Sequence, residues 1–115
     1  MIKSSWLLAL LVCVTAGAET TLDWMTTVAK DGRHNAFTDL VRWHEQYYVC
    51  FRHADSHMSM DGEIRVMRSN DMKTWEPCGV LDTFGDDRDP HFAVASDMLY
   101  VYFGTWDLQH DAGNG

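Results

Sequence analysis

The sequence has 115 residues, of which 46% are hydrophobic and 12% aromatic, and this composition excludes collagen-like, coiled-coil and low-complexity chains. This length leaves room for one small domain. Nine lysines and arginines against seventeen acidic residues give a net charge of −8, so the phosphates of nucleic acids are an unsuitable partner.

Residues 1–18 have the three-part layout of a secretory signal peptide. Lys3 supplies a positive charge, residues 6–14 form an unbroken apolar run, and Ala16 and Ala18 are small residues of the kind that precede a cleavage site. The run is about half of the ~20 residues that span a bilayer, which argues against a permanent transmembrane helix. We therefore expect cleavage after Ala18, a secreted or periplasmic mature chain without a membrane span, and a lead-in segment at residues 19–33.

Residues 34–115 are expected to form one all-β domain, because no stretch after residue 18 has the apolar period of a helix. Strands are predicted at 36–43, 47–52, 64–68 and 75–81, and the last carries Pro77 and Gly79, which favour the edge of a sheet. The charged segment 85–90 is predicted to be a loop. Two further strands are predicted at 91–95 and 98–104.

The pattern of the first two strands recurs in the last two, with Tyr48 and Tyr100 about fifty residues apart, a spacing typical of propeller blades. This recurrence favours a β-propeller fragment of one four-stranded antiparallel blade plus the first strands of a second blade. A small antiparallel sandwich with similar hairpins is the alternative. Because part of a ring of blades cannot complete its core, we expect an N-terminal fragment of a longer protein, with its remaining blades as partners.

The segment Ser69-Asn70-Asp71-Met72-Lys73-Thr74-Trp75 joins the third and fourth predicted strands. The Asp71 carboxylate and the Ser69 hydroxyl can bond turn amides, and Trp75 can pack between sheets. The segment resembles the Asp-box, or BNR repeat, of sialidase-like propellers, in a form one residue shorter and without the usual glycine. It is also similar to blades of five-bladed arabinanase- and β-xylosidase-like glycosidases. The resemblance implies a structural role for the box and a glycan substrate, with no cofactor.

The similarity to the first blade of a sialidase covers residues 34–106 and implies roles for individual side chains. It places Arg52 at an arginine that faces the substrate pocket and Asp61 at the acid/base aspartate. The Arg-Ile-Pro segment of sialidases is replaced by residues 37–39, and the nucleophilic tyrosine and its glutamate would lie beyond Gly115. The similarity to five-bladed enzymes instead implies that Asp39 is a general base.

Two further acidic positions bear on catalysis. Asp39 interrupts an apolar strand, so its carboxylate must face a cavity or be paired, either by nearby amides or by Arg42. Asp89, directly before Pro90, is predicted to project into an axial pocket as a catalytic carboxylate, with Arg88 holding a sugar hydroxyl or carboxylate. Residues 86 and 87 are instead expected to be solvated aspartates of the charged loop.

The remaining candidates are histidines and cysteines. The segment from His53 to His57 contains two histidines four residues apart, a spacing that suits one metal ion on a helix. Because the segment is predicted to be a loop, we expect no metal. We favour a polar pocket lining, with His57 as a substrate contact. Cys50 and Cys78 either form one disulfide or remain two buried thiols on neighbouring strands, and the sequence leaves both open.

These observations predict the N-terminal part of a secreted glycoside hydrolase-like propeller, inactive by itself, because hydrolysis needs two carboxyl groups astride the glycosidic bond. A non-catalytic propeller that binds carbohydrate or protein is one alternative, because the fold does not fix the function. A five-bladed inverting glycosidase is the other. The candidate residues are Asp61, Asp39 and Asp89 for catalysis and Arg52, Arg88 and His57 for binding.

Overall fold

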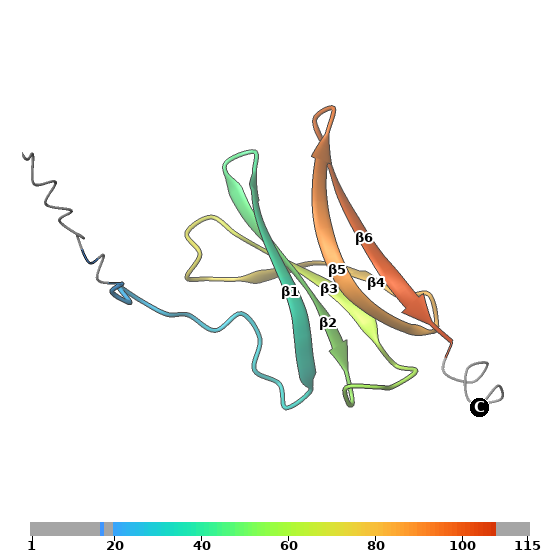
Figure 1. The fold of residues 1–115 in the computed structure, drawn as a ribbon. Coiled ribbons are helices and arrows are strands. Elements are labelled where there is room, and N and C mark those ends of the chain that lie inside the picture. The colour runs from blue at the N-terminus through green and yellow to red at the C-terminus, as the bar shows by residue number, and fades with distance from the viewer. Residues whose placement is uncertain (1–16, 18–19, 108–115) are drawn as a thin grey trace, which may run out of the picture.

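The computed structural model describes residue 17 and residues 20–107, and in this part of the chain every regular element is a strand (Figure 1). The predicted all-β class is therefore confirmed. The described residues include no helix long and apolar enough to cross a membrane. The predicted signal sequence and its cleavage position lie outside the described residues. The strands are β1 (His34–Trp43), β2 (Gln46–Ala54), β3 (Glu63–Ser69), β4 (Glu76–Leu81), β5 (Asp86–Ala95) and β6 (Met98–Trp106).

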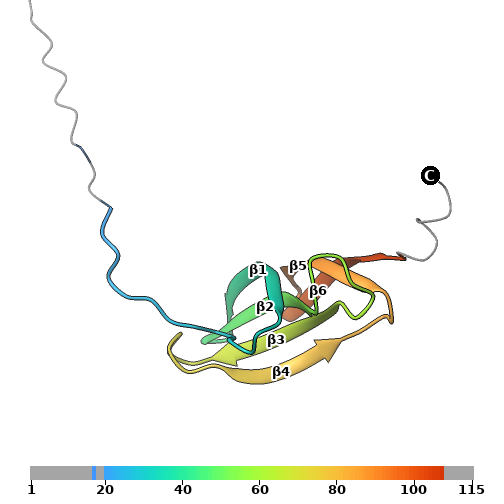
Figure 2. The ribbon, with the colours of Figure 1, turned by 90° about the horizontal axis from the view of Figure 1, so that it is seen from below.

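The strands form two antiparallel sheets, one with the order β1-β2-β3-β4 and one that contains β5 and β6 (Figure 2). In β3 the buried residues Ile64 and Val66 alternate with more exposed side chains, as the period of a strand requires. Tyr48 and Cys50 of β2 complete this buried cluster. Hydrophobic side chains of the second sheet pack against the cluster, namely Phe92, Leu99, Val101 and Phe103.

The backbone of the β1–β2 hairpin recurs in the β5–β6 hairpin. Strand β5 begins at residue 86 and β1 at residue 34, β6 begins at 98 and β2 at 46, so both strands repeat after 52 residues. Each hairpin has a register shift at the same place in its first strand and a two-residue turn with positive φ, the geometry of type I′ turns. The positive-φ pairs related by this offset are Phe37 and Asp89, His44 and Ser96, and Glu45 and Asp97.

One predicted loop is wrong. Residues 86–90 form the first half of β5, and Asp86 and Asp87, expected to be solvated, are fully buried. Their charge suggested a loop because a carboxylate is buried only when other groups satisfy it. The partner of Asp86 is Arg52, 34 residues earlier, and those of Asp87 are Thr83 and Thr105, whose hydroxyl groups give no signal of this role in the sequence. The predicted edge position of the strand with Pro77 and Gly79 is confirmed, since β4 ends its sheet.

The segment from Ser69 to Trp75 forms a turn held by its own side chains, as its sequence predicts. The Ser69 hydroxyl oxygen accepts hydrogen bonds from the amides of Asp71 (3.2 Å) and Met72 (2.9 Å). One carboxylate oxygen of Asp71 accepts from the amides of Lys73 and Thr74, both at 2.8 Å. The Thr74 amide, followed by the Lys73 amide, lowers the pKa of Asp71 below its ordinary value. Trp75 lies partly buried next to this turn.

Replacing Asp71 by alanine should lower the melting temperature, because the amides of Lys73 and Thr74 lose their acceptor. Lys73→Ala is the matched control, since it changes an exposed side chain of the same turn and keeps the amide. Thermal unfolding followed by tryptophan fluorescence measures the difference. Equal melting temperatures for the two variants would contradict this account of the turn.

Candidate functional site

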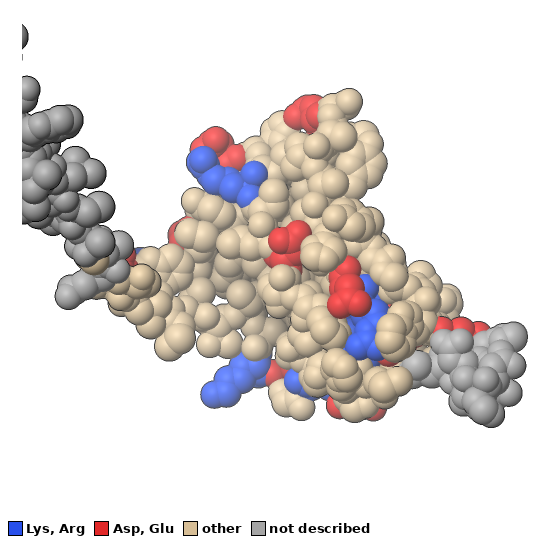
Figure 3. All heavy atoms as spheres, viewed as in Figure 1, with Lys and Arg blue, Asp and Glu red and all other residues tan. Residues whose placement is uncertain are grey.

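Polar side chains gather at the end of the sheets where β2 ends, β5 begins and the loop 55–62 joins β2 to β3. On the face that Figure 3 views, some acidic side chains lie beside basic ones and others lie among uncharged residues, without a large patch of one sign. Several of these side chains are buried, including Arg52, His53 and the first three residues of β5. Because buried charges must be paired, their partners determine which of them can meet a ligand.

Arg52 and Asp86 form a fully buried ion pair between β2 and β5. One Asp86 carboxylate oxygen lies 2.8 Å from Nε and 2.6 Å from Nη2 of Arg52. Nη1 donates to the carbonyl of Ser56 at 2.8 Å, which fixes the loop after β2. The sequence placed Arg52 in a substrate pocket, whereas this guanidinium lies inside the protein and is occupied by protein acceptors.

The next two residues of β5 are also held by the protein. The Asp87 carboxylate accepts hydrogen bonds from the amide (2.8 Å) and hydroxyl (2.5 Å) of Thr83 and from the hydroxyl of Thr105 (2.6 Å). The Arg88 guanidinium carbon lies 4.3 Å from the ring centre of Trp106 and 5.2 Å from that of Phe37, within the range of cation–π contacts. Arg88, predicted to bind substrate, is thus enclosed between two aromatic rings.

His57 lies next to this stack. Its carbonyl accepts a hydrogen bond from Nη2 of Arg88 at 3.3 Å, and its ring centre lies 5.4 Å from that of His34 and 5.7 Å from that of Phe37. The side chain is exposed, so the predicted contact of His57 with a substrate is sterically open.

Asp61 lies in a surface cluster that joins the lead-in segment to the loop after β2. Its carboxylate pairs with Arg33 at 2.5 Å and accepts hydrogen bonds from the Ser59 hydroxyl and the Asp55 amide. The Ser59 hydroxyl, with the Asp55 amide and Arg33, lowers the pKa of Asp61 from 3.8 to about 2. Asp61 is therefore a carboxylate near neutral pH, which suits a base or an electrostatic role and not proton donation.

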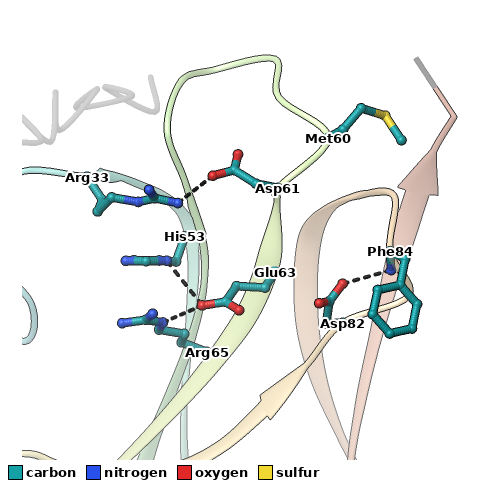
Figure 4. A pocket seen from close by; sticks show the side chains of 8 residues that line it. All are labelled: Arg33, His53, Met60, Asp61, Glu63, Arg65, Asp82 and Phe84. Carbon is teal, nitrogen blue, oxygen red and sulfur yellow. Dashed lines mark hydrogen bonds and ion pairs between the residues drawn. The ribbon is translucent and has the colours of Figure 1, made fainter. Parts of the chain in front are cut away.

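A cavity of about 510 Å³ lies beside Asp61 (Figure 4). Figure 4 shows the side chains of His53 and Arg65 directed toward Glu63. Glu63 Oε1 lies 2.7 Å from Arg65 Nε and 3.2 Å from His53 Nδ1. Four charged side chains of the cavity wall are thus paired, Asp61 with Arg33 and Glu63 with Arg65. Its other lining residues are Arg33, Met60, Asp82 and Phe84.

Asp39 bonds amides, which was one of the open possibilities at this position. One carboxylate oxygen accepts from the Leu40 amide and the other from the Phe92 amide of β5, both at 2.9 Å. The Phe92 amide makes the largest contribution to lowering the pKa of Asp39. The alternative ion pair with Arg42 is not formed, because Arg42 pairs with Glu45.

Asp89 lies exposed at the register shift of β5, with φ of 53°. Within residues 20–107 its carboxylate has no hydrogen-bond partner, which leaves it open to a ligand. The structure does not bring the three predicted catalytic carboxylates together. Asp39, Asp61 and Asp89 have no contact with one another in the described part of the chain.

Cys50 and Cys78 are free thiols, so the disulfide alternative is wrong. The alternative of two buried thiols on neighbouring strands is correct only in the burial of Cys50. Cys50 lies buried on β2, where burial raises the pKa of its thiol to about 11, whereas Cys78 is exposed on β4. Strand β3 separates them, which places their backbones about 10 Å apart, beyond the ~7 Å reach of a disulfide.

Sequence reasoning missed the residues of the lead-in segment that hold this end of the sheet. An Asp31 carboxylate oxygen accepts from the side chain of Asn35 (2.9 Å) and the amide of Arg33 (3.1 Å), and the other lies 3.0 Å from Nε2 of His53. The Asp-Gly pair at 31–32 was the available signal, because it marks a turn and Gly32 has φ of 78°.

Comparisons with known proteins do not name a family, since no family model, curated protein or solved structure matches the chain. In the described residues, no group of three His, Cys, Asp or Glu side chains is arranged to hold a metal ion.

The Gly62→Ala variant should be strongly destabilised. A Cβ atom at this position would lie 2.4 Å from Oδ1 of Asp86 and 3.1 Å from Nε of Arg52, so the buried ion pair would have to separate. Breaking such a pair costs about 3 kcal/mol or more. Gly79→Ala is the control, because an added Cβ there meets nothing within 4 Å. Urea unfolding would measure both, and a loss no larger than that of the control would count against the account of the ion pair.

The Asp61 carboxylate should stabilise the folded protein above about pH 4 and lose this effect at lower pH. Because folding lowers the pKa of this group from 3.8 to about 2, its contribution is fully present above pH 4 and disappears as the pH falls toward 2. The difference in melting temperature between the original protein and Asp61→Asn should therefore shrink over that range. A difference that stays constant from about pH 6 to pH 2.5 would show that the carboxylate is not stabilised in this way.

Proposed function

We propose that residues 34–106 are one blade and the first two strands of the next blade in a secreted, sialidase-like β-propeller that acts on glycans as a glycoside hydrolase. The observation that carries this proposal is the 52-residue repeat of bulge and turn, combined with an Asp-box turn between β3 and β4. Repeats of this length with four antiparallel strands are typical of propeller blades.

The packing of the two sheets supports the same proposal. Strands β5 and β6 cover the apolar face of β2 and β3, as one blade covers the next, and the Arg52–Asp86 pair fixes this contact at one end. In a propeller the first strand of each blade lies nearest the axis, so Asp39 on β1 and Asp89 on β5 would face the central pocket.

The lowered pKa values of two carboxylates support one of the two roles that hydrolysis requires. Hydrolysis requires one carboxyl group that donates a proton and one carboxylate that acts as base or nucleophile. Since the pKa values of Asp39 and Asp61 are both lowered, each suits the second role. The proton donor would then come from another part of the propeller, and we expect the 115-residue chain alone to hydrolyse no aryl glycoside.

A non-catalytic propeller that binds glycans is the second candidate. It is favoured by one observation, namely that Arg52 is occupied by Asp86 and Asp61 by Arg33. The two side chains through which the first blade of a sialidase would act are thereby held in protein contacts.

Kinetics of variants in the complete propeller separate these candidates. Aryl glycosides of sialic acid, arabinose and xylose serve as substrates. If Asp39 is the base, Asp39→Asn should lower kcat by about 10²–10⁴-fold. The asparagine oxygen can still accept from the Phe92 amide, but the Leu40 amide loses its acceptor, so the melting temperature is measured beside kcat and the two proteins are compared where both are folded.

Asp61→Ala tests the sialidase-like assignment in the same assay, and Asp55→Ala is its control in the same loop. A large fall in kcat for Asp61→Ala alone favours the sialidase-like role, and a fall for Asp39→Asn alone favours the five-bladed type. If the original protein hydrolyses a substrate and none of these substitutions lowers kcat, the catalytic roles are refuted. If the original protein hydrolyses none of the substrates, the glycan-binding candidate is favoured.

A further inference from the structure

Phe84 is an aromatic side chain held out in solvent. Its residue is 87% exposed, and its φ of 64° lies in the left-handed region, which is unfavourable for a bulky residue. Its amide donates to the Asp82 carboxylate at 2.7 Å, which holds this conformation. Packing within the described chain does not account for the cost, because the ring buries little surface.

The ring stands between two hollows. Phe84 and Met60 line the cavity of about 510 Å³ described above, and they also line a second hollow of about 350 Å³. Figure 4 shows the ring beside Asp82, at the side of the first cavity away from Arg33 and His53. The second hollow is polar as well, with Thr83 and Thr105 among its lining residues.

The first cavity offers donors and acceptors without a strong net charge. Arg33 is occupied by Asp61, and one oxygen of Glu63 is occupied by Arg65. In the described part of the chain, the second carboxylate oxygens of Glu63 and Asp82 have no hydrogen-bond partner, and neither has Nη2 of Arg65. Acceptors and a donor therefore surround an exposed ring. Asp82 is the lining carboxylate without a basic partner among the described residues, and its negative charge disfavours an anionic ligand.

We propose that Phe84 is the stacking platform of a binding site for a neutral sugar unit of a glycan. The apolar face of a sugar ring would lie on the phenyl ring, and its hydroxyl groups would bond the free oxygens of Asp82 and Glu63 and the Arg65 guanidinium. The site contains neither Asp39 nor Asp89, so it is separate from the innermost strands. It rests on the proposed function only in that the ligand is a glycan.

Affinity electrophoresis of the full chain tests this site without any requirement for hydrolysis. Native gels contain arabinan or xylan as neutral probes, or polysialic acid as an anionic one. The original protein should be retarded by a neutral probe. Phe84→Ala should weaken that binding about three- to tenfold, and Phe84→Tyr should retain it. Tyr100→Ala is the matched control, because Tyr100 is an exposed aromatic residue on β6 outside both hollows.

The inference is overturned if neither neutral probe retards the protein, if only polysialic acid does, or if Phe84→Ala and Tyr100→Ala bind like the original protein. Its failure is distinguishable from that of the proposed catalysis. If the protein hydrolyses aryl glycosides but Phe84→Ala binds the polysaccharide as well as the original protein does, the catalytic proposal stands and the Phe84 site is refuted. Phe84-dependent binding without hydrolysis would leave the site and remove the catalytic proposal.

Discussion

The buried ion pair between Arg52 and Asp86 fixes how the two sheets meet. Two fully buried charges are tolerated only in direct contact, so the start of β5 has one place to lie relative to the end of β2. Gly62 belongs to the same constraint, since its carbonyl accepts the Asp87 amide at 3.1 Å and its missing side chain leaves room for the pair. The position of β5 then brings the Phe92 amide to Asp39.

Local signals in the sequence were sufficient for most of the fold. Strand periodicity located β3 through Ile64 and Val66, and the Ser69–Asp71 pattern predicted a turn whose bonds all lie within a few residues. Residues 86–90 were misread because the partner of Asp86 is Arg52, 34 residues earlier. A buried carboxylate and a solvated one look alike in a sequence, and only the distant partner distinguishes them.

The sequence predicted which residues belong to the candidate site, but not their partners or their state of ionisation. The sequence selected Asp61, yet its ionised state depends on Ser59 and on Arg33, which the sequence assigned to a lead-in segment. Phe84 gave no sequence signal, because its exposure and its left-handed backbone follow from a loop conformation fixed by Asp82. Such side chains become visible only when the course of the loop is known.

The two-stranded sheet has a consequence for handling the protein. Within the described residues β6 pairs with β5 alone, so the main-chain N–H and C=O groups on its other edge form no hydrogen bonds with a further strand. Margins of this kind, with aromatic side chains such as Tyr100 and Tyr102 beside them, recruit strands from other molecules. Concentrated solutions of the chain should therefore be prone to intermolecular β-assembly, and protection of this margin is a practical requirement for solution work.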